Sequence, residues 1–316
     1  EAMLFAAGIS DRLGKVEDGT TVTDFEPEEI KRKCSLSAAS APVDWNGKIL
    51  NVIDVPGYFD FIGEMMGPLR VVETAVIVVG AVSGVTVGTE KAWHFATKAG
   101  LGRMFVINQM DREHASFAKI AQELRDAYGN SVVPVLLPLG DGANFRGVIN
   151  VLEQKAFEGA YKQSHEVPVP DDMKAQMDQA FEYLTEQAAA SDDELMMKYL
   201  DGEQLTHDEI MLGFRKGMKS GSIVPVCAVS AGTGVGVTRM LDLMTKYLPS
   251  PSYDDHAQEG VDPATGETIS RICKDDQPFS AFVYKTIADP FVGKLSLFRI
   301  MSGKLTAQTP LYNVNK

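Results

Sequence analysis

Apolar strands alternate with helical patterns along most of this 316-residue chain, and this alternation limits the possible folds more than any other feature. Runs typical of strands lie at about 48–53, 74–81, 103–107 and 223–229. Helical patterns lie at about 60–72, 89–99, 115–128 and 237–247. Runs such as AVIVV and MFVIN are apolar on both faces, as in a parallel sheet that helices cover on both sides. The sequence therefore predicts an α/β fold with a doubly wound, mostly parallel sheet.

Composition excludes several classes of protein. The net charge of −13 argues against an extended nucleic-acid groove across the whole surface. The longest apolar run, at 75–82, is far shorter than the roughly 20 residues that a membrane span needs. The three cysteines have no CxxC spacing and are expected to be plain thiols. We therefore expect a cytoplasmic protein that contacts no membrane. We also expect a monomer.

The loops after the strands carry the residues with useful chemistry, because ligands of such sheets bind beyond the carboxyl ends of the strands. These loops read DVPG at 54–57, AVSGVTVGTE at 81–90, NQMD at 108–111 and SAGTG at 230–234. Asp54 can hold a hydrated Mg²⁺. Gly57 offers a backbone N–H with no side chain to obstruct the approach of a phosphate. Taken alone, DVPG is more typical of an ordinary turn at a strand end.

The loops NQMD and SAGTG suit a guanine base. Asp111 can accept hydrogen bonds from the N1–H and the exocyclic amine of guanine, a donor pair that adenine lacks. Backbone N–H groups of SAGTG can donate to the guanine O6. The candidate nucleotide-binding residues of the two loops are Asn108, Gln109, Asp111, Ser230, Ala231 and Gly232. Three motifs in this order, each after its own strand, predict a site for GTP or GDP with Mg²⁺.

The order DVPG, NQMD, SAG resembles the motifs of translational GTPases, and the resemblance covers nearly the whole chain. IDVPGYFDFIGEMMGPLRVVETAVIVVGAVSGV is similar to the second-switch region of elongation factor G, and INQMDRE to its guanine-specificity loop. KYLPSP resembles the exit from its G domain, and FSAFVYKTIADPFVGKLSLFRIMSGKL the opening of its second domain. The chain resembles a paralogue of this factor that carries Tyr where the translocase carries His after DxPG.

This resemblance implies a division of the chain into domains. We expect a G domain at 1–131 and 223–251, an inserted α+β subdomain at 132–222, a linker at 252–275 and the start of a truncated β-barrel domain II at 276–316. Capping boxes at SDDE (191–194) and THDE (206–209) predict helix starts within the insertion. From the residues alone, the insertion is equally a surface module of another kind.

The phosphate-binding motif GxxxxGK[ST] does not occur in the sequence. Residues 1–9 resemble the helix that follows this P-loop, so we expect the chain to be a fragment that begins just after it and ends within domain II. A fragment of this kind is expected to be inactive, whereas the full-length parent would be a GTPase. The rival interpretation is a relative of the GTPases that has lost nucleotide binding.

Three residues depart from the family pattern in ways that bear on the chemistry. Ser35 stands where the resemblance places a Mg²⁺-contacting Thr, and it keeps the hydroxyl group. Gln109 replaces the Lys of NKxD, so we expect weaker nucleotide binding. Tyr58 replaces the His that is associated with the attacking water. A phenol with a pKa of about 10 can hydrogen-bond a water but transfers protons poorly.

The resemblance implies a GTP-driven switch that hydrolyses GTP on the ribosome, where rRNA is part of its partner. In this switch, Asp54 and Ser35 hold Mg²⁺, Gly57 senses the γ-phosphate and Tyr58 is the candidate catalytic residue. The alternative is a non-hydrolysing interaction module that uses the same surfaces. The residues leave open whether the parent acts in translocation, recycling or stress rescue.

Overall fold

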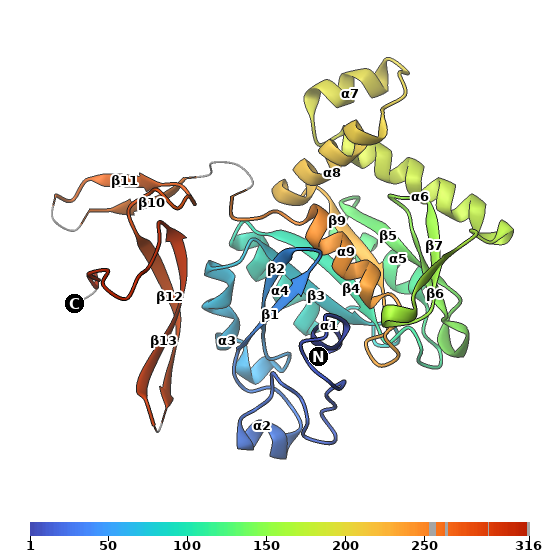
Figure 1. The fold of residues 1–316 in the computed structure, drawn as a ribbon. Helices are drawn as coiled ribbons and strands as arrows, with labels where there is room; N and C mark the ends of the chain where they lie inside the picture. The colour runs from blue at the N-terminus through green and yellow to red at the C-terminus, as the bar shows by residue number, and fades with distance from the viewer. Residues whose placement is uncertain (253–256, 263–264, 290, 315–316) are drawn as a thin grey trace. The chain divides into compact units, whose positions relative to one another are not determined.

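A mixed sheet forms the centre of the computed structural model, which describes residues 1–252, 257–262, 265–289 and 291–314. Its strands are β3 (Thr74–Gly80), β4 (Gly102–Asn108), β5 (Val132–Leu139), β6 (Gly147–Asn150), β7 (Lys155–Glu158), β8 (His165–Val167) and β9 (Val224–Ala228). Their order in the sheet is β3-β4-β9-β5-β6-β7-β8. β3, β4, β9 and β5 run parallel to one another (Figure 1). β6, β7 and β8 continue the sheet, each antiparallel to the strand before it.

Helices flank this sheet and complete its hydrophobic core (Figure 1). The helices are α1 (Ala2–Ala6), α2 (Pro27–Arg32), α3 (Gly63–Met66), α4 (Val87–Lys98), α5 (Phe117–Tyr128), α6 (Asp171–Ala189), α7 (Asp193–Leu200), α8 (His207–Ser220) and α9 (Val237–Tyr247). β5 is buried at all but one position, as the apolar run VVPVLLPL requires of a strand covered on both faces. Phe105 of β4 and Phe214 of α8 are fully buried in the same core. The predicted α/β fold is confirmed.

The strand expected at 48–53 forms outside this sheet. β1 (Ala39–Trp45) and β2 (Lys48–Asp54) pair antiparallel as a two-stranded sheet of their own. Asn46 and Gly47 join them with φ values of 51° and 72°, as the favoured two-residue hairpin turn requires. This turn explains why β2 pairs with its neighbour in the chain, and Asp54 therefore sits at the end of a hairpin.

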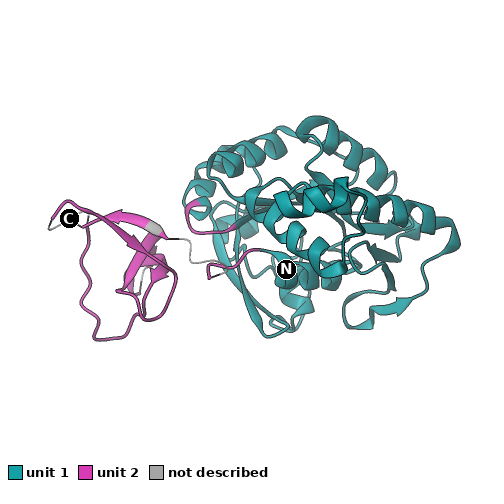
Figure 2. Cartoon of the chain, turned by 90° about the horizontal axis from the view of Figure 1, so that it is seen from above, with its two compact units in different colours: residues 1–69, 74–248 teal, residues 70–73, 249–316 magenta. Residues whose placement is uncertain are grey.

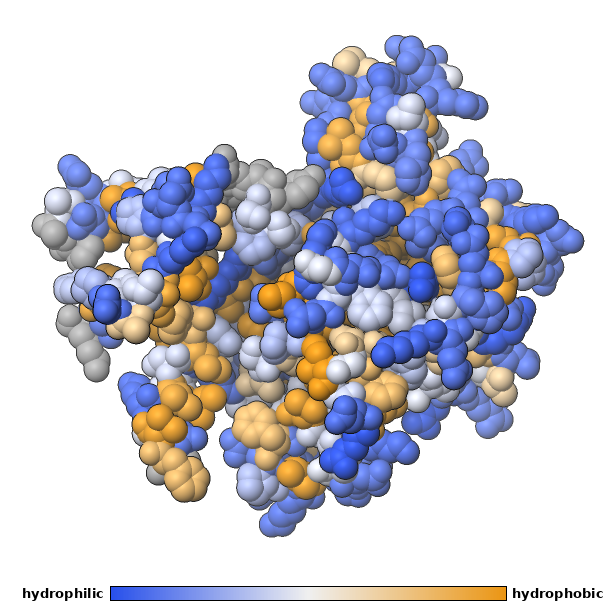
Figure 3. Space-filling model, in the orientation of Figure 1, coloured by the Kyte–Doolittle hydropathy of each residue, from blue (hydrophilic) through white to orange (hydrophobic). Residues whose placement is uncertain are grey.

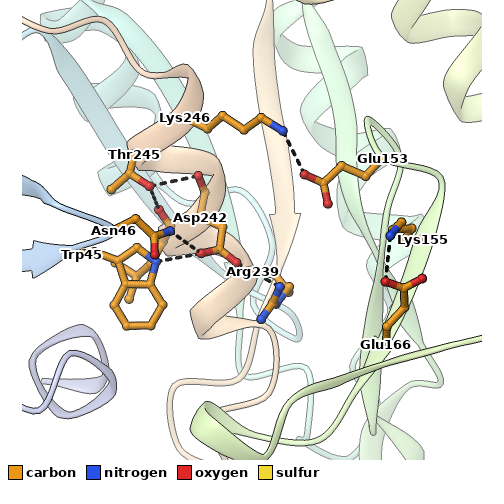
Figure 4. A network of polar contacts seen from close by, with 10 residues as sticks. Trp45, Asn46, Glu153, Lys155, Glu166, Arg239, Asp242, Thr245 and Lys246 are labelled. Atoms are coloured by element: carbon orange, nitrogen blue, oxygen red, sulfur yellow. Dashed lines mark hydrogen bonds and ion pairs between the residues drawn. The ribbon is translucent and has the colours of Figure 1, made fainter.

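The hairpin β1–β2 is attached to the rest of the fold by side chains. Ala41 and Val43 pack with Leu4 of α1 and Leu241 of α9 in a second, smaller core cluster. A polar network adds to this contact, as Figure 4 shows for Asp242 of α9. Its Oδ1 accepts hydrogen bonds from the Trp45 indole nitrogen at 2.8 Å and from the Asn46 amide at 2.9 Å. The hairpin's position is thus tied to α9.

Two sequence predictions about helices need correction. The helix expected at 60–72 is broken into η1 (Phe59–Phe61), α3 (Gly63–Met66) and η2 (Pro68–Arg70), because a residue before proline disfavours helical backbone. The capping box expected at 191–194 is absent, since Asp192 is the N-cap of α7 and Ser191 bonds the Gln187 carbonyl. The capping box at 206–209 is confirmed, with Thr206 as the N-cap of α8.

Residues 132–222, predicted as an insertion, add strands β5 to β8 to the central sheet. They also supply the short turns η3 (Gly142–Asn144) and η4 (Tyr161–Gln163) and the helices α6 to α8. Contacts between residues place this range in one compact unit with the rest of 1–69 and 74–248 (Figure 2). The domain limits given by the resemblance remain predictions.

The second unit contains residues 70–73 and 249–316 (Figure 2). Its strands form two antiparallel hairpins, β10 (Gln258–Val261) with β11 (Thr268–Arg271) and β12 (Ser280–Asp289) with β13 (Gly293–Ser302). Arg299 of β13 donates to the Val71 carbonyl at 2.8 Å and pairs with Glu73. Parts of the predicted linker (253–256 and 263–264) and of the predicted domain II (290 and 315–316) lie outside the described residues.

The three cysteines, Cys34, Cys227 and Cys273, are free thiols. Burial raises the pKa of the Cys227 thiol, so this group is held protonated in the core. Within the described ranges, no helix combines the length and the apolar character that crossing a bilayer requires.

Candidate nucleotide-binding site

Two of the predicted loops meet at the ends of β4 and β9. Asn108 is the last residue of β4, and we call residues 230–236, which follow β9, the base loop. Asn108 Oδ1 accepts a hydrogen bond from the Ala231 backbone N–H at 2.9 Å. The hydroxyl of Ser230, which is fully buried, donates to Asp111 Oδ1 at 2.6 Å. The structure therefore brings NQMD and SAG together, as expected for the carboxyl ends of neighbouring parallel strands.

Asp111 keeps hydrogen-bonding capacity for a ligand. Its side chain is half-buried, and its Oδ2 accepts no hydrogen bond among residues 1–252. A carboxylate with one oxygen engaged by Ser230 is held in a fixed orientation, while its other lone pairs can accept from paired donors such as those of guanine. This geometry suits the predicted base contact.

Backbone contacts hold the NQMD turn in place. The N–H of the buried residue Met110 donates to the Val229 carbonyl at 3.2 Å, and the Met110 carbonyl accepts from Gly142 at 2.9 Å. Gln109 has a φ of 66°, which is uncommon for a residue with a side chain. Its side chain is exposed and lies near Gly80, the last residue of β3. A Cβ added to Gly80 would lie 3.8 Å from Gln109 Oε1. The turn thus exposes Gln109 while burying its neighbour.

Asp54 is the last residue of β2, which belongs to a different sheet from β4 and β9. Burial is the main cause that raises the pKa of Asp54 above its ordinary value, and the nearby carboxylates of Asp24 and Glu1 raise it further. A hydrogen bond with the Thr23 side chain acts in the opposite direction. The N-terminal amino group also lowers this pKa, so Asp54 lies in a largely desolvated setting with charges of both signs nearby.

These residues fit a Mg²⁺ ion, which the predicted nucleotide site implies. Asp24 Oδ1 and Glu1 Oε2 are buried oxygens without a hydrogen-bond partner, and a cation would relieve both their desolvation and that of Asp54. Mg²⁺ commonly binds through one or two carboxylates, with water and substrate phosphates as its other ligands. The described residues contain no group of three or more His, Cys, Asp or Glu side chains that could hold a metal ion. Asp54 is the residue that would hold the ion.

The remaining predicted residues of the phosphate side are exposed or only partly buried. Gly57 is open to solvent, and a Cβ added to it would have no atom within 4 Å. Tyr58 has 62% of its surface exposed and precedes η1. Ser35 lies half-buried between α2 and β1 and forms no hydrogen bond with Asp54 within residues 1–252. The proposed roles of Tyr58 and Ser35 therefore rest on the family resemblance and not on a contact with Asp54.

Sequence reasoning missed two residues that contact this site. The Thr23 side chain lowers the pKa of Asp54, and the hydroxyl of Tyr161 donates to the Ala231 carbonyl at 3.3 Å. Both lie in segments without a motif, and the contact of Tyr161 spans 70 positions in the sequence. A strand or helix pattern carries no signal for such a contact, because it depends on how the loops pack.

Comparison with known proteins identifies the family. The profile of the Elongation factor Tu GTP binding domain matches residues 1–250. A Thermus thermophilus protein of known crystal structure is 31% identical, with a TM-score of 0.85. That match covers 96% of this chain and 43% of the other, so the chain spans less than half of that protein's length. Since the family profile covers well over half of the chain, the protein belongs to the family of the elongation factor Tu GTP-binding domain.

Proposed function

We propose that this chain is the switch part of a translational GTPase related to elongation factor G, which binds GTP or GDP with Mg²⁺ and hydrolyses GTP on the ribosome. The observation that carries the proposal is the pair of contacts between the base loop and NQMD, from Ser230 to Asp111 and from Ala231 to Asn108. They support it by bringing Asp111 next to the base loop, because a carboxylate together with backbone amides can read the edge of a guanine. Family membership supports the same conclusion.

The roles follow from position and chemistry. Asp54 would hold Mg²⁺ through water, Gly57 would bind the γ-phosphate through its N–H, and loss of that phosphate would release the loop after β2. Tyr58 would lie beside the attacking water when the loop is ordered. The Mg²⁺ would neutralise the phosphate charge. Partner-dependent ordering of this kind suits a cytoplasmic monomer that acts only on its ribosomal partner.

Exposed apolar side chains near the loop after β2 favour a macromolecular partner. Phe25 and Phe59 are 58% and 61% exposed, and apolar residues interrupt the polar surface on the face shown in Figure 3. The alternative function, a non-hydrolysing interaction module, would use the same surface. GTP turnover separates the two, because a module of that kind would bind ribosomes without releasing phosphate.

The guanine assignment is tested by Asp111→Asn in an N-terminally extended chain that carries a GxxxxGK[ST] segment. The substitution should lower GDP affinity about 5- to 150-fold, because one buried mismatch is worth about 1–3 kcal/mol. Affinity for xanthosine diphosphate should rise, since an amide suits its carbonyl. Asp126→Asn, at an exposed residue of α5, is the control and should change neither affinity. Unchanged GDP binding by the Asp111 variant would mean that Asp111 is only a turn residue.

A further inference from the structure

Tyr161 joins the segment 132–222 to the base loop. It opens the turn η4, and its hydroxyl donates to the Ala231 carbonyl at 3.3 Å. Its backbone N–H makes a longer hydrogen bond of 3.5 Å to the Gly234 carbonyl. The preceding residue, Ala160, forms a β-bridge with Val235. Two consecutive residues thus contact the base loop at three points.

The fit between the Tyr161 ring and the base loop is close. Gly234 has a φ of 83°, and a Cβ at this position would lie 2.0 Å from Tyr161 Cε2, so only glycine permits this approach. The ring of Phe5, from α1, contacts Tyr161 edge-on at 4.9 Å between centroids. Tyr161 itself has a φ of 47°, a conformation that side chains disfavour and that its surroundings must enforce. Burial raises the pKa of its hydroxyl, which therefore remains a donor at neutral pH.

This hydroxyl acts on a particular peptide unit. The Ala231 carbonyl and the Gly232 N–H belong to one planar trans peptide, so they point in opposite directions and turn together. Ala231 is also held at its own N–H by Asn108. The Gly232 N–H donates no hydrogen bond within residues 1–252, and Gly232 is exposed. Holding the Ala231 carbonyl therefore fixes the direction of a free donor in the loop whose Ser230 contacts Asp111.

We propose that Tyr161 is a positioning residue for guanine recognition, which holds the Ala231–Gly232 peptide so that the Gly232 N–H faces the O6 of a bound guanine. The segment 132–222 is then part of the specificity pocket. The inference rests on the proposed function, because the donor is useful only where a purine binds. It adds a specificity-determining contact from outside the three loops.

The first test measures the base loop in the 316-residue chain without nucleotide. Tyr161→Phe removes only the hydroxyl, and amide hydrogen exchange at Ser230, Ala231 and Gly234 should accelerate about three- to tenfold, as expected for one lost hydrogen bond. Tyr183→Phe is the matched control, because the Tyr183 hydroxyl also donates to a backbone carbonyl, that of Asn130 at 2.6 Å. It should leave exchange in the base loop unchanged. Equal exchange in all three proteins would overturn the proposal.

The second test asks whether the hydroxyl acts at O6. In the N-terminally extended chain, Tyr161→Phe should weaken GDP binding about three- to tenfold. Binding of 6-thio-GDP should weaken less, because sulfur is a poor acceptor at that position while the donors for Asp111 remain. Tyr183→Phe should affect neither nucleotide. Equal losses for both nucleotides would overturn the assignment to O6.

The outcomes separate this inference from the proposed function. If the unsubstituted extended chain fails to bind GDP, the proposed function falls, and the guanine role of Tyr161 falls with it. If that chain binds GDP while exchange and affinity are unchanged in Tyr161→Phe, only the role of Tyr161 is wrong.

Discussion

At the residue scale, the loop after β2 shows side chains held in unfavourable surroundings. Asp54 is half-buried near two other carboxylates, and burial above all raises the pKa of this carboxyl group. Tyr58 exposes 62% of an aromatic side chain to solvent. Neither arrangement stabilises the fold. Residues of this kind are often kept for ligand binding, where the ligand supplies the missing partner.

Asp54→Asn should raise the melting temperature at pH 7. Because the pKa of Asp54 is higher in the folded chain than in the unfolded chain, the folded chain binds this proton more tightly. The charged form therefore costs stability above the folded pKa, and this cost disappears as the pH falls through the folded and then the unfolded pKa. The gain should be present at pH 7 and lost near pH 3. Thermal denaturation at both pH values checks this, with Asp60→Asn, at an exposed residue of the same segment, as the control.

Tyr58→His should increase ribosome-stimulated GTP hydrolysis by the extended chain about tenfold, while GDP affinity stays the same. An imidazole can orient the attacking water, whereas the longer phenol holds it farther from the in-line position. Single-turnover rates with saturating ribosomes measure the effect, and Tyr58→Phe is the matched variant that removes only the hydroxyl. A His variant slower than the parent would show that Tyr58 is an evolved solution with its own geometry.

At the element scale, the sequence predicted regular helices and buried strands well, and irregular segments poorly. α9 has the predicted bounds, 237–247, because its apolar positions repeat with the helical period. The meeting of Asp111 with Ser230 follows from parallel strands that end on the same edge. The break around Gly67 and Pro68 was missed, since the apolar pattern continues across it. Tyr161 was also missed, because its contact depends on loop packing.

The hairpin β1–β2 should depend on Asp242 of α9. This carboxylate accepts from Trp45 and Asn46 and pairs with Arg239 at 3.1 Å (Figure 4), so Asp242→Ala leaves the partly buried donors of Trp45 and Arg239 without this acceptor. We expect a loss of about 1–3 kcal/mol in the free energy of unfolding.

Urea denaturation measures this loss, and amide exchange should show that residues 39–54 open first. Glu153→Ala is the control from the same region, because it removes the more exposed ion pair between Lys246 and Glu153, and such pairs contribute about 0–1 kcal/mol (Figure 4). If the Asp242 variant is no less stable than the Glu153 variant, the apolar cluster alone holds the hairpin.

At the scale of the whole molecule, every candidate nucleotide-binding residue lies in the unit formed by 1–69 and 74–248. That unit holds the proposed base contacts at NQMD and the base loop and the proposed cation contact at Asp54. The sequence holds no GxxxxGK[ST] segment to bind the phosphates. If the proposed base contacts are right, the 316-residue chain can select the base but has few donors for the most highly charged part of the ligand.

The 316-residue chain should consequently bind GDP weakly, with a Kd above about 1 μM. Backbone amides and a lysine of a P-loop make the charge-assisted hydrogen bonds that contribute most of the affinity for phosphates, and the base contacts alone do not replace them. Calorimetry on this chain and on the N-terminally extended chain measures the difference, which should reach roughly two orders of magnitude. Guanosine, which lacks phosphates, should bind both chains alike. Sub-micromolar binding of GDP to the 316-residue chain would contradict this prediction and would place phosphate-binding groups elsewhere in the unit.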